Sequence, residues 1–408
     1  MTSLLEFKFI RAFCCAVLLI VGNAILIENA CALAMMPQTE EISEKQRYDE
    51  AIEKTRELTK ECRRISINFF DGSLAKSYQW KSEWDEVTLK LRQQKPILEK
   101  AALDWFEQCE EPSPELLQLA GLIANQLNEE GKFDLALKVL RKVKTHLPEV
   151  KDVTLERLLA LLSIKTNHFE DAVDFMSRKD ARESVGDLES QLDINMFSLC
   201  PLLIEKWKTE KETRQQEAEA NDLPRVKLQL STGEVEVELF ENEAPETVAN
   251  FISLVESGFY DGAYFHPVVD RLTAQVGSVF KSEKESIDYV IKNESRLPQR
   301  RNHFAGTLTM STAENGKDSA SVGFAILLIP NPDLDWNGKE DDAISQPAFG
   351  RVVTGLEHVA EFPATLEVDP ESGDQKILRE VQPGHIEKAT VIRKRDHEYH
   401  FEKLRPSE

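Results

Sequence analysis

The sequence predicts a multidomain α plus β chain, with an α-helical N-terminal half and a β-rich C-terminal domain behind a targeting segment. Three observations support this prediction. The chain has 408 residues, which is enough for two or three domains. Apolar residues recur at helical spacing up to about residue 222, and from Arg225 they alternate with polar residues instead. An apolar run also lies close to the N-terminus, where export signals occur.

The charge balance limits the classes of function that the sequence is compatible with. The chain carries 50 basic and 72 acidic residues, for a formal net charge of −22 at pH 7. Because a phosphate backbone requires a basic footprint, this balance argues against a general nucleic-acid binder. It is typical of a self-repelling surface and does not specify a fold.

Residues 1–34 have the pattern of a secretory signal peptide. Lys8 and Arg11 precede an apolar run from Ala12 to Ile27, and Ala32-Leu33-Ala34 fits a cleavage site. We therefore expect an exported protein, periplasmic or secreted. The alternative is an uncleaved N-terminal anchor, and only in that case do we expect contact with a membrane.

Three cysteines remain after this segment: Cys62, Cys109 and Cys200. An odd, widely spaced trio is not a disulfide framework, although one bridge stays open in an oxidising compartment. The sequence shows no Cys or His spacing typical of zinc, so we expect neither a metal nor a cofactor.

Residues 35–112 are predicted to be helical. One helix covers Glu40 to Asn68, and a second covers Ala75 to Cys109 with a break at Pro96. Ser113-Pro114-Glu115 then has the order of an N-cap, a first-position proline and a first-turn acid, which predicts a new helix start.

Residues 113–207 contain a repeated pattern. Gly131, Phe133 and Ala136 recur 36 residues later as Asn167, Phe169 and Ala172. This pattern resembles tetratricopeptide repeats, whose period is about 34 residues. The resemblance implies stacked helix hairpins and a surface for a protein partner. The alternative is a generic helical bundle. A further helical segment runs from Asp187 to Trp207, and the charged residues 208–224 are predicted to be a linker, the tail of a solvated helix.

From Arg225 the chain reads as β structure. Residues 225–230 and 233–239 alternate apolar and polar side chains on either side of Ser231-Thr232, which predicts a β-hairpin with one buried face. Pro245 then opens a short amphipathic helix that extends to Glu256.

Several motifs in this region, in order, resemble a known family. They are GEVEVELFENEAPETVANFISLVESGFYDGAYFHPVV (233–269), AGTLTMS (305–311), Leu334-Asp335 and AFGRVVTGLEHV (348–359). The sequence from 225 to 395 thus resembles a cyclophilin-type peptidyl-prolyl cis-trans isomerase, followed by a tail at 396–408. The resemblance implies a closed, eight-stranded antiparallel β-barrel with two helices.

The family isomerises X-Pro peptide bonds, whose uncatalysed barrier is about 18–20 kcal/mol. An apolar pocket holds the proline ring, and an arginine donates to the prolyl nitrogen in the twisted state. At the family arginine's position, after Phe-His, this chain has Pro267, so the catalytic donor is unknown. Arg271 is an alternative donor if the strand continues regularly to that point.

The resemblance also places a peptide-binding pocket. The family's aromatic and methionine fall on Leu272 and Thr273, its second pocket phenylalanine on Ala325, and its histidine on Gln346. Loss of aromatic contact area predicts weaker proline binding. The positions carried over by resemblance are Phe265, His266, Leu272, Thr273, Gln275, Phe324, Ala325, Leu334 and Gln346.

An acidic segment, Asp333 to Asp342, matches the opening of a calcium loop. The twelfth position should be Glu but is Ile344. We therefore expect a solvated acidic loop here, with calcium as the alternative.

The sequence thus predicts an exported member of this isomerase family that assists protein folding with a degenerate, weakly active site. Its expected partners are proline-containing peptides or unfolded proteins. The alternative is a non-catalytic peptide-binding scaffold that uses the repeat-like and barrel domains. A further hypothesis is that the helical domain covers and gates the pocket. The architecture is also similar to that of thylakoid-lumen cyclophilins, which leaves that compartment open.

Overall fold

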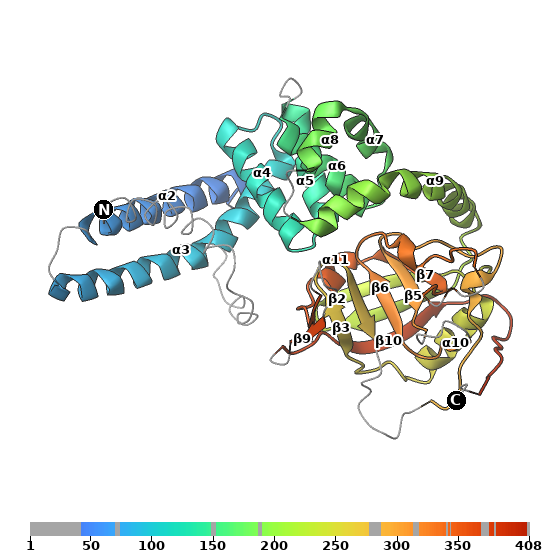
Figure 1. Ribbon diagram of the computed structural model, residues 1–408. Helices are drawn as coiled ribbons and strands as arrows, with labels where there is room; N and C mark the ends of the chain where they lie inside the picture. The colour runs from blue at the N-terminus through green and yellow to red at the C-terminus, as the bar shows by residue number, and fades with distance from the viewer. Residues whose placement is uncertain are drawn as a thin grey trace, which may run out of the picture. The chain divides into compact units, whose positions relative to one another are not determined.

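The computed structural model describes most of the chain after the N-terminal segment. The predicted signal peptide, residues 1–34, lies outside the described residues. The described residues form two compact units, one within residues 42–126 and 143–146 and the other within residues 127–142 and 147–405 (Figure 1). The described residues are 42–69, 74–147, 152–186, 190–276, 287–312, 318–339, 342, 344–368, 375–378 and 381–405.

Two long helices, α2 (Glu44–Phe69) and α3 (Leu74–Gln108), lie side by side in the first unit (Figure 1). They share one apolar cluster, which comprises Leu58, Cys62, Ile65 and Val87. The helix break expected at Pro96 is wrong, because α3 continues through this residue. Proline removes one helical hydrogen bond, and packing of α3 along α2 compensates for that loss.

The helices around the predicted repeats follow the expected positions. The next helix, α4, begins at Pro114, and the Leu116 N–H donates to the Ser113 hydroxyl (3.2 Å), which confirms the predicted cap. The later helices are α4 (Pro114–Glu129), α5 (Phe133–His146), α6 (Val153–Lys165), α7 (Glu170–Ser177), α8 (Lys179–Val185) and α9 (Gln191–Ala220).

The two copies of the repeat share a local geometry. Gly131 and Asn167 both adopt positive φ, 75° and 64°, in the turns that precede α5 and α7. The phenylalanine and the alanine that follow each turn are buried in both copies. The helical nature of this region is confirmed, and the tetratricopeptide assignment stays a prediction.

Helix α9 differs from the expected solvated tail. It runs unbroken through most of the predicted third helical segment (187–207) and most of the predicted linker (208–224), and it ends at Ala220. Two of its acids, Glu210 and Glu217, are buried, with 4% and 8% exposure. Both pair with the buried Arg301, which lies 91 and 84 residues away in the sequence. Short-range patterns cannot reveal such a partner.

The C-terminal region forms one ten-stranded sheet, ordered β10-β1-β2-β7-β5-β6-β4-β3-β8-β9. All pairs are antiparallel except β3 with β8. The strands are β1 (Arg225–Leu230), β2 (Gly233–Leu239), β3 (Phe265–Val269), β4 (Thr273–Val276), β5 (Thr307–Met310), β6 (Phe324–Leu327), β7 (Ala348–Thr354), β8 (Leu366–Val368), β9 (Gln375–Ile377) and β10 (Ile386–Arg393).

This sheet confirms the predicted hairpin and modifies the expected barrel. β1 and β2 have the predicted bounds, and α10 (Pro245–Glu256) coincides with the predicted helix. The ladders of the described residues give a linear order of ten strands rather than a ring of eight, so closure of the barrel stays a prediction. A second helix, α11 (Leu356–Ala360), and two short 3₁₀ helices (Glu294–Arg296 and Pro332–Leu334) complete this region.

Aromatic rings fill the core of the sheet domain. Phe251 of α10 meets Phe324 of β6 edge to face, with ring centroids 5.3 Å apart. Tyr260 and Phe349 pack around the same two rings. Such offset and edge-on contacts add to the free energy gained by burial, so this cluster anchors α10 to the sheet.

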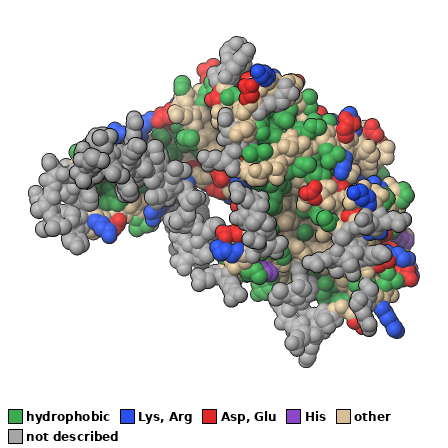
Figure 2. Space-filling view, viewed as in Figure 1, with side chains coloured by type: hydrophobic (Ala, Val, Ile, Leu, Met, Phe, Trp, Pro, Cys, Tyr) green, Lys and Arg blue, Asp and Glu red, His purple; other side chains and the backbone are tan. Residues whose placement is uncertain are grey.

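The remaining observations concern cysteines and the surface. Cys62, Cys109 and Cys200 are all free and buried, so the disulfide left open by the sequence does not form. Burial raises the pKa of the Cys200 thiol to about 11. Acidic and basic side chains are interspersed on the face seen in Figure 2. Among the helices described, none has the length and apolarity needed to cross a membrane.

Candidate functional site

The predicted pocket residues lie around β4, β5 and β6. Gln275 of β4 pairs with Ala325 of β6, which in turn pairs with Thr309 of β5. Because side chains alternate across a strand, these three residues share one face of the sheet. The opposite face carries Phe324 and its buried neighbours.

Hydrogen bonds connect further predicted residues to this row. The Gln275 amide donates to the Ser311 hydroxyl (2.9 Å), and the Gln346 backbone N–H donates to the Leu334 carbonyl (3.0 Å). Gln346 also contacts Thr309 through its side chain (3.2 Å). The structure therefore brings Gln275, Ala325, Leu334 and Gln346 together at one place.

Two predicted positions, Phe265 and Phe324, lie inside the domain. Both side chains are fully buried, and their ring centroids are 6.4 Å apart. Phe265 also packs on Phe362 (4.7 Å). These rings support the sheet from its inner side and do not reach solvent.

The segment at Pro267 is a bulge in β3. Phe265 pairs with Val276, whereas Val268 pairs with Ala274, so His266 and Pro267 together oppose one residue of β4. The His266 imidazole Nδ1 lies 2.9 Å from the Thr365 hydroxyl. Pro267 is half-buried and brings no side-chain donor to this position.

Arg271 does not extend β3 as the sequence hypothesis required. It has a positive φ of 57° and lies in the turn between β3 and β4. Its guanidinium contacts Asp270 (3.2 Å) and Glu129 (3.4 Å). A Cβ atom at Gly131 would lie 3.4 Å from Arg271 Cγ, so the turn before α5 approaches this arginine closely. Leu272 and Thr273 follow directly, both half-buried.

The acidic segment is engaged by protein groups. Asp342 accepts backbone N–H bonds from Asn337, Ile344 and Ser345. Burial opposes ionisation of this carboxyl, but these N–H donors hold the pKa of Asp342 below its ordinary value. Asp335 is bound by His303 and Lys206. Across the described residues, no group of three potential ligands is arranged to hold a metal.

Sequence reasoning missed three polar residues that adjoin the pocket: His303, Thr309 and Asp335. His303 Nδ1 lies 2.7 Å from Asp335, and its Nε2 lies 3.0 Å from the Thr309 hydroxyl. All three side chains are almost fully buried. The available signal was Asp335, which directly follows the predicted pocket residue Leu334 in the same motif.

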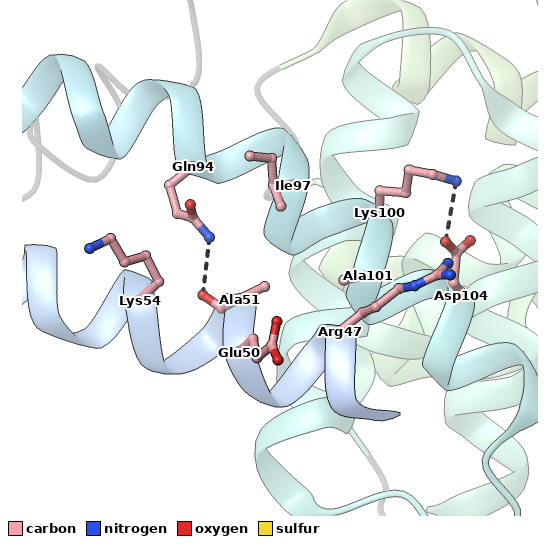
Figure 3. A pocket seen from close by; sticks show the side chains of 9 residues that line it. All are labelled: Arg47, Glu50, Ala51, Lys54, Gln94, Ile97, Lys100, Ala101 and Asp104. Carbon is pink, nitrogen blue, oxygen red and sulfur yellow. Dashed lines mark hydrogen bonds and ion pairs between the residues drawn. The ribbon is translucent and has the colours of Figure 1, made fainter. Parts of the chain in front are cut away.

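Two cavities lie away from these residues. One, of about 450 Å³, lies in the first unit between α2 and α3, where Gln94 donates to the Ala51 carbonyl and Lys100 approaches Asp104 (Figure 3). The other, also about 450 Å³, lies in the second unit beside the Gly131 turn. None of the predicted pocket residues lines either cavity.

Comparison with known proteins identifies the sheet domain. Residues 225–388 match the family described as cyclophilin type peptidyl-prolyl cis-trans isomerase/CLD. The chain is 32% identical over 170 residues to peptidyl-prolyl cis-trans isomerase A of Dickeya dadantii, covering 41% of this chain and 85% of that protein. It is 38% identical over 123 residues to isomerase B of Bacillus subtilis, covering 30% and 78%.

A solved cyclophilin-type isomerase from Cryptosporidium parvum aligns at 18% identity and a TM-score of 0.32, covering 41% of this chain and 97% of that one. The sequence matches to the two bacterial isomerases extend over most of those enzymes' length. Through its C-terminal domain, this chain belongs to the cyclophilin-type peptidyl-prolyl cis-trans isomerase family.

Proposed function

We propose that this chain is an exported isomerase of the family that binds proline-containing segments of unfolded proteins and turns them over weakly. The observation that supports weak turnover is Pro267, which stands in the β3 bulge where the family resemblance places an arginine. The Arg271 guanidinium is engaged by Asp270 and Glu129 instead. Loss of one electrostatic donor typically costs about 10²–10³ in rate.

The test is an isomerase assay on an Ala-Pro peptide with the full chain. We expect turnover to be about 10²-fold below that of the Bacillus subtilis relative, assayed in parallel. Pro267→Arg should raise turnover about tenfold or more, whereas Pro267→Ala, the matched control, should not. Wild-type turnover within tenfold of the relative would contradict a degenerate site.

The second candidate is a non-catalytic peptide-binding scaffold. The same substitution favours it, together with the repeat-like turns of Gly131 and Asn167, whose shared positive φ supports tetratricopeptide-like hairpins and a partner surface. A binding titration with the same peptide separates the two candidates. Binding with no measurable turnover supports the scaffold, whereas turnover above the uncatalysed rate supports the isomerase.

Export is proposed from the apolar segment before Ala34. N-terminal sequencing of the protein recovered from its native host tests it. We expect the mature chain to begin just after residue 34. An intact Met1 in a membrane fraction would instead indicate an anchor.

A further inference from the structure

A chain of polar contacts connects helix α9 to the predicted pocket. The Lys206 ammonium pairs with Asp335, which also accepts the backbone N–H of His303 (2.9 Å) and faces His303 Nδ1 (2.7 Å). His303 Nε2 lies 3.0 Å from the Thr309 hydroxyl, and that hydroxyl donates to the Gln346 amide oxygen (3.2 Å). Lys206 lies outside the segment that matches the family, so the family resemblance does not account for this connection.

The contact between Asp335 and His303 determines where one proton of the imidazole lies. Burial opposes ionisation of Asp335, but the hydrogen bonds from His303 and Lys206 outweigh it and lower the pKa of this carboxyl. Asp335 is therefore a carboxylate and can only accept. It follows that His303 Nδ1 carries a proton, and only the state of Nε2 remains variable.

The state of Nε2 determines the direction of the next two hydrogen bonds. If Nε2 is bare, the Thr309 hydroxyl donates to it and has no proton left for Gln346. Thr309 then accepts from the Gln346 NH₂ group, and the amide oxygen points away. If Nε2 is protonated, it donates to Thr309, which donates to the Gln346 oxygen, and the NH₂ group points away. The Pro347 carbonyl is a longer alternative acceptor for Thr309 (3.5 Å).

We propose that the proton on His303 sets which end of the Gln346 amide faces the peptide, and that Lys206 on α9 adjusts this switch through Asp335. The proposal rests on the proposed function, because it assumes that the pocket binds prolyl peptides. Lys206 acts as a positioning residue for this site.

The two amide orientations differ in what they offer a peptide. A prolyl residue has no backbone N–H, so around the proline a pocket must chiefly donate to carbonyl oxygens. An outward NH₂ group supplies such a donor, whereas an outward oxygen does not. Protonation of His303 should therefore strengthen binding of prolyl peptides.

The charges around the imidazole give the direction of the Lys206 effect. Among the described residues, the charged groups that contact His303 directly or through one partner are Asp335 and Lys206. Lys206 neutralises part of the Asp335 charge. Without the Lys206 ammonium, the full negative charge of Asp335 acts on His303. The imidazole should therefore hold its proton to a higher pH.

The first experiment titrates a proline-containing tetrapeptide into the full chain between about pH 5 and pH 8.5. We expect binding to tighten about five- to tenfold toward low pH, the effect of one hydrogen bond. Lys206→Met should move the midpoint upward by about one pH unit, and Lys206→Arg should restore it. Lys208→Met is the matched control: it removes an exposed ammonium that pairs with Glu205 on the same helix, and it should leave the midpoint unchanged. An unchanged midpoint in Lys206→Met overturns the proposal.

A second measurement distinguishes a pH effect that acts through His303 from one that acts through His266. It also distinguishes failure of the switch from failure of the proposed function. Thr309→Val removes the central hydroxyl and keeps His266, so it should abolish the pH dependence. Without peptide, the NMR signals of the Gln346 side-chain amide should titrate with His303 in the wild type and not in Thr309→Val. An amide that does not titrate overturns the switch even if peptides bind. If no prolyl peptide binds at any pH, the proposed function fails, and the amide titration still decides whether the relay exists.

Discussion

Two regions of the sheet domain differ in how they use polar side chains. Among the predicted pocket residues themselves, the side-chain contacts that the structure describes involve uncharged groups, as between Gln275 and Ser311. Where α9 meets the same domain, the contacts join buried charges, with Arg301 and Arg351 facing acids. The comparison teaches that the guanidinium groups of Arg301 and Arg351 stabilise the contact with a helix, whereas the position expected to carry the family's arginine holds a proline.

The α9 contact is an ion network with a buried centre. Arg301 donates to both carboxylate oxygens of Glu210 (2.8 Å each) and also pairs with Glu217. Its guanidinium lies over the Phe240 ring, 4.0 Å from the centroid. A planar donor held by two acids and a ring fixes the rotation of α9 about its axis.

The largest expected effect comes from breaking this network. Arg301→Met removes the cation that Glu210 and Glu217 share and leaves each acid with one remaining arginine, and we expect the free energy of unfolding to fall by about 3–5 kcal/mol. Urea unfolding of the full chain measures it. Lys211→Met is the control, because it removes an exposed pair with Glu170 worth about 1 kcal/mol or less.

A triple variant shows whether unpaired charge causes the loss. Adding Glu210→Gln and Glu217→Gln to Arg301→Met should recover part of the stability, since the two buried acids are then neutral. A loss below about 1 kcal/mol in Arg301→Met alone would show that water compensates the two acids.

A smaller effect is expected at the turn before α7. The Asn167 side chain donates to the Ala305 carbonyl and accepts the Ala305 N–H, both at 3.0 Å. Asn167→Gly keeps the positive φ but loses both bonds, which should cost about 1–2 kcal/mol. Asn167→Ala should cost about 1 kcal/mol more, because alanine also strains this backbone conformation. Equal losses in the two variants, measured by urea unfolding, would argue against the backbone contribution.

The smallest expected effect is on the stability of the protein at low pH. Burial opposes ionisation of Glu210, yet Arg301 and Arg214 hold its pKa below the ordinary value of 4.5. A lowered carboxyl contributes stability above its unfolded pKa and loses it as pH falls through the folded value. We therefore expect unfolding free energy to decline from about pH 4.5 downward, and less steeply in Glu210→Gln. Identical pH profiles for both proteins would contradict this.

The sequence predicted the parts of the fold that depend on local patterns. Alternation defined β1 and β2, and Pro245 marked the start of α10, because strand faces and helix starts are encoded by neighbouring residues. The burial of Glu210 could not be predicted, since its partner Arg301 is remote in sequence. The helix break predicted at Pro96 was wrong for a related reason: packing of α3 against α2 overrides the local tendency of proline to end a helix.

The candidate site was predicted unevenly. Register pairs Gln275 with Ala325, and Gln346 joins them through Thr309. The chain of contacts through His303 could not be predicted, because its members come from a helix, a strand and loops that are remote in sequence.

The last strand has a practical consequence for anyone who excises the sheet domain. The family match stops at residue 388, inside β10, and starts at residue 225. Arg393, beyond that limit, donates to the Leu223 carbonyl and to Asn221, and the Leu404 N–H binds the Val290 carbonyl. A recombinant fragment limited to residues 225–388 would lose both sets of hydrogen bonds, whereas one spanning residues 221–405 would retain them.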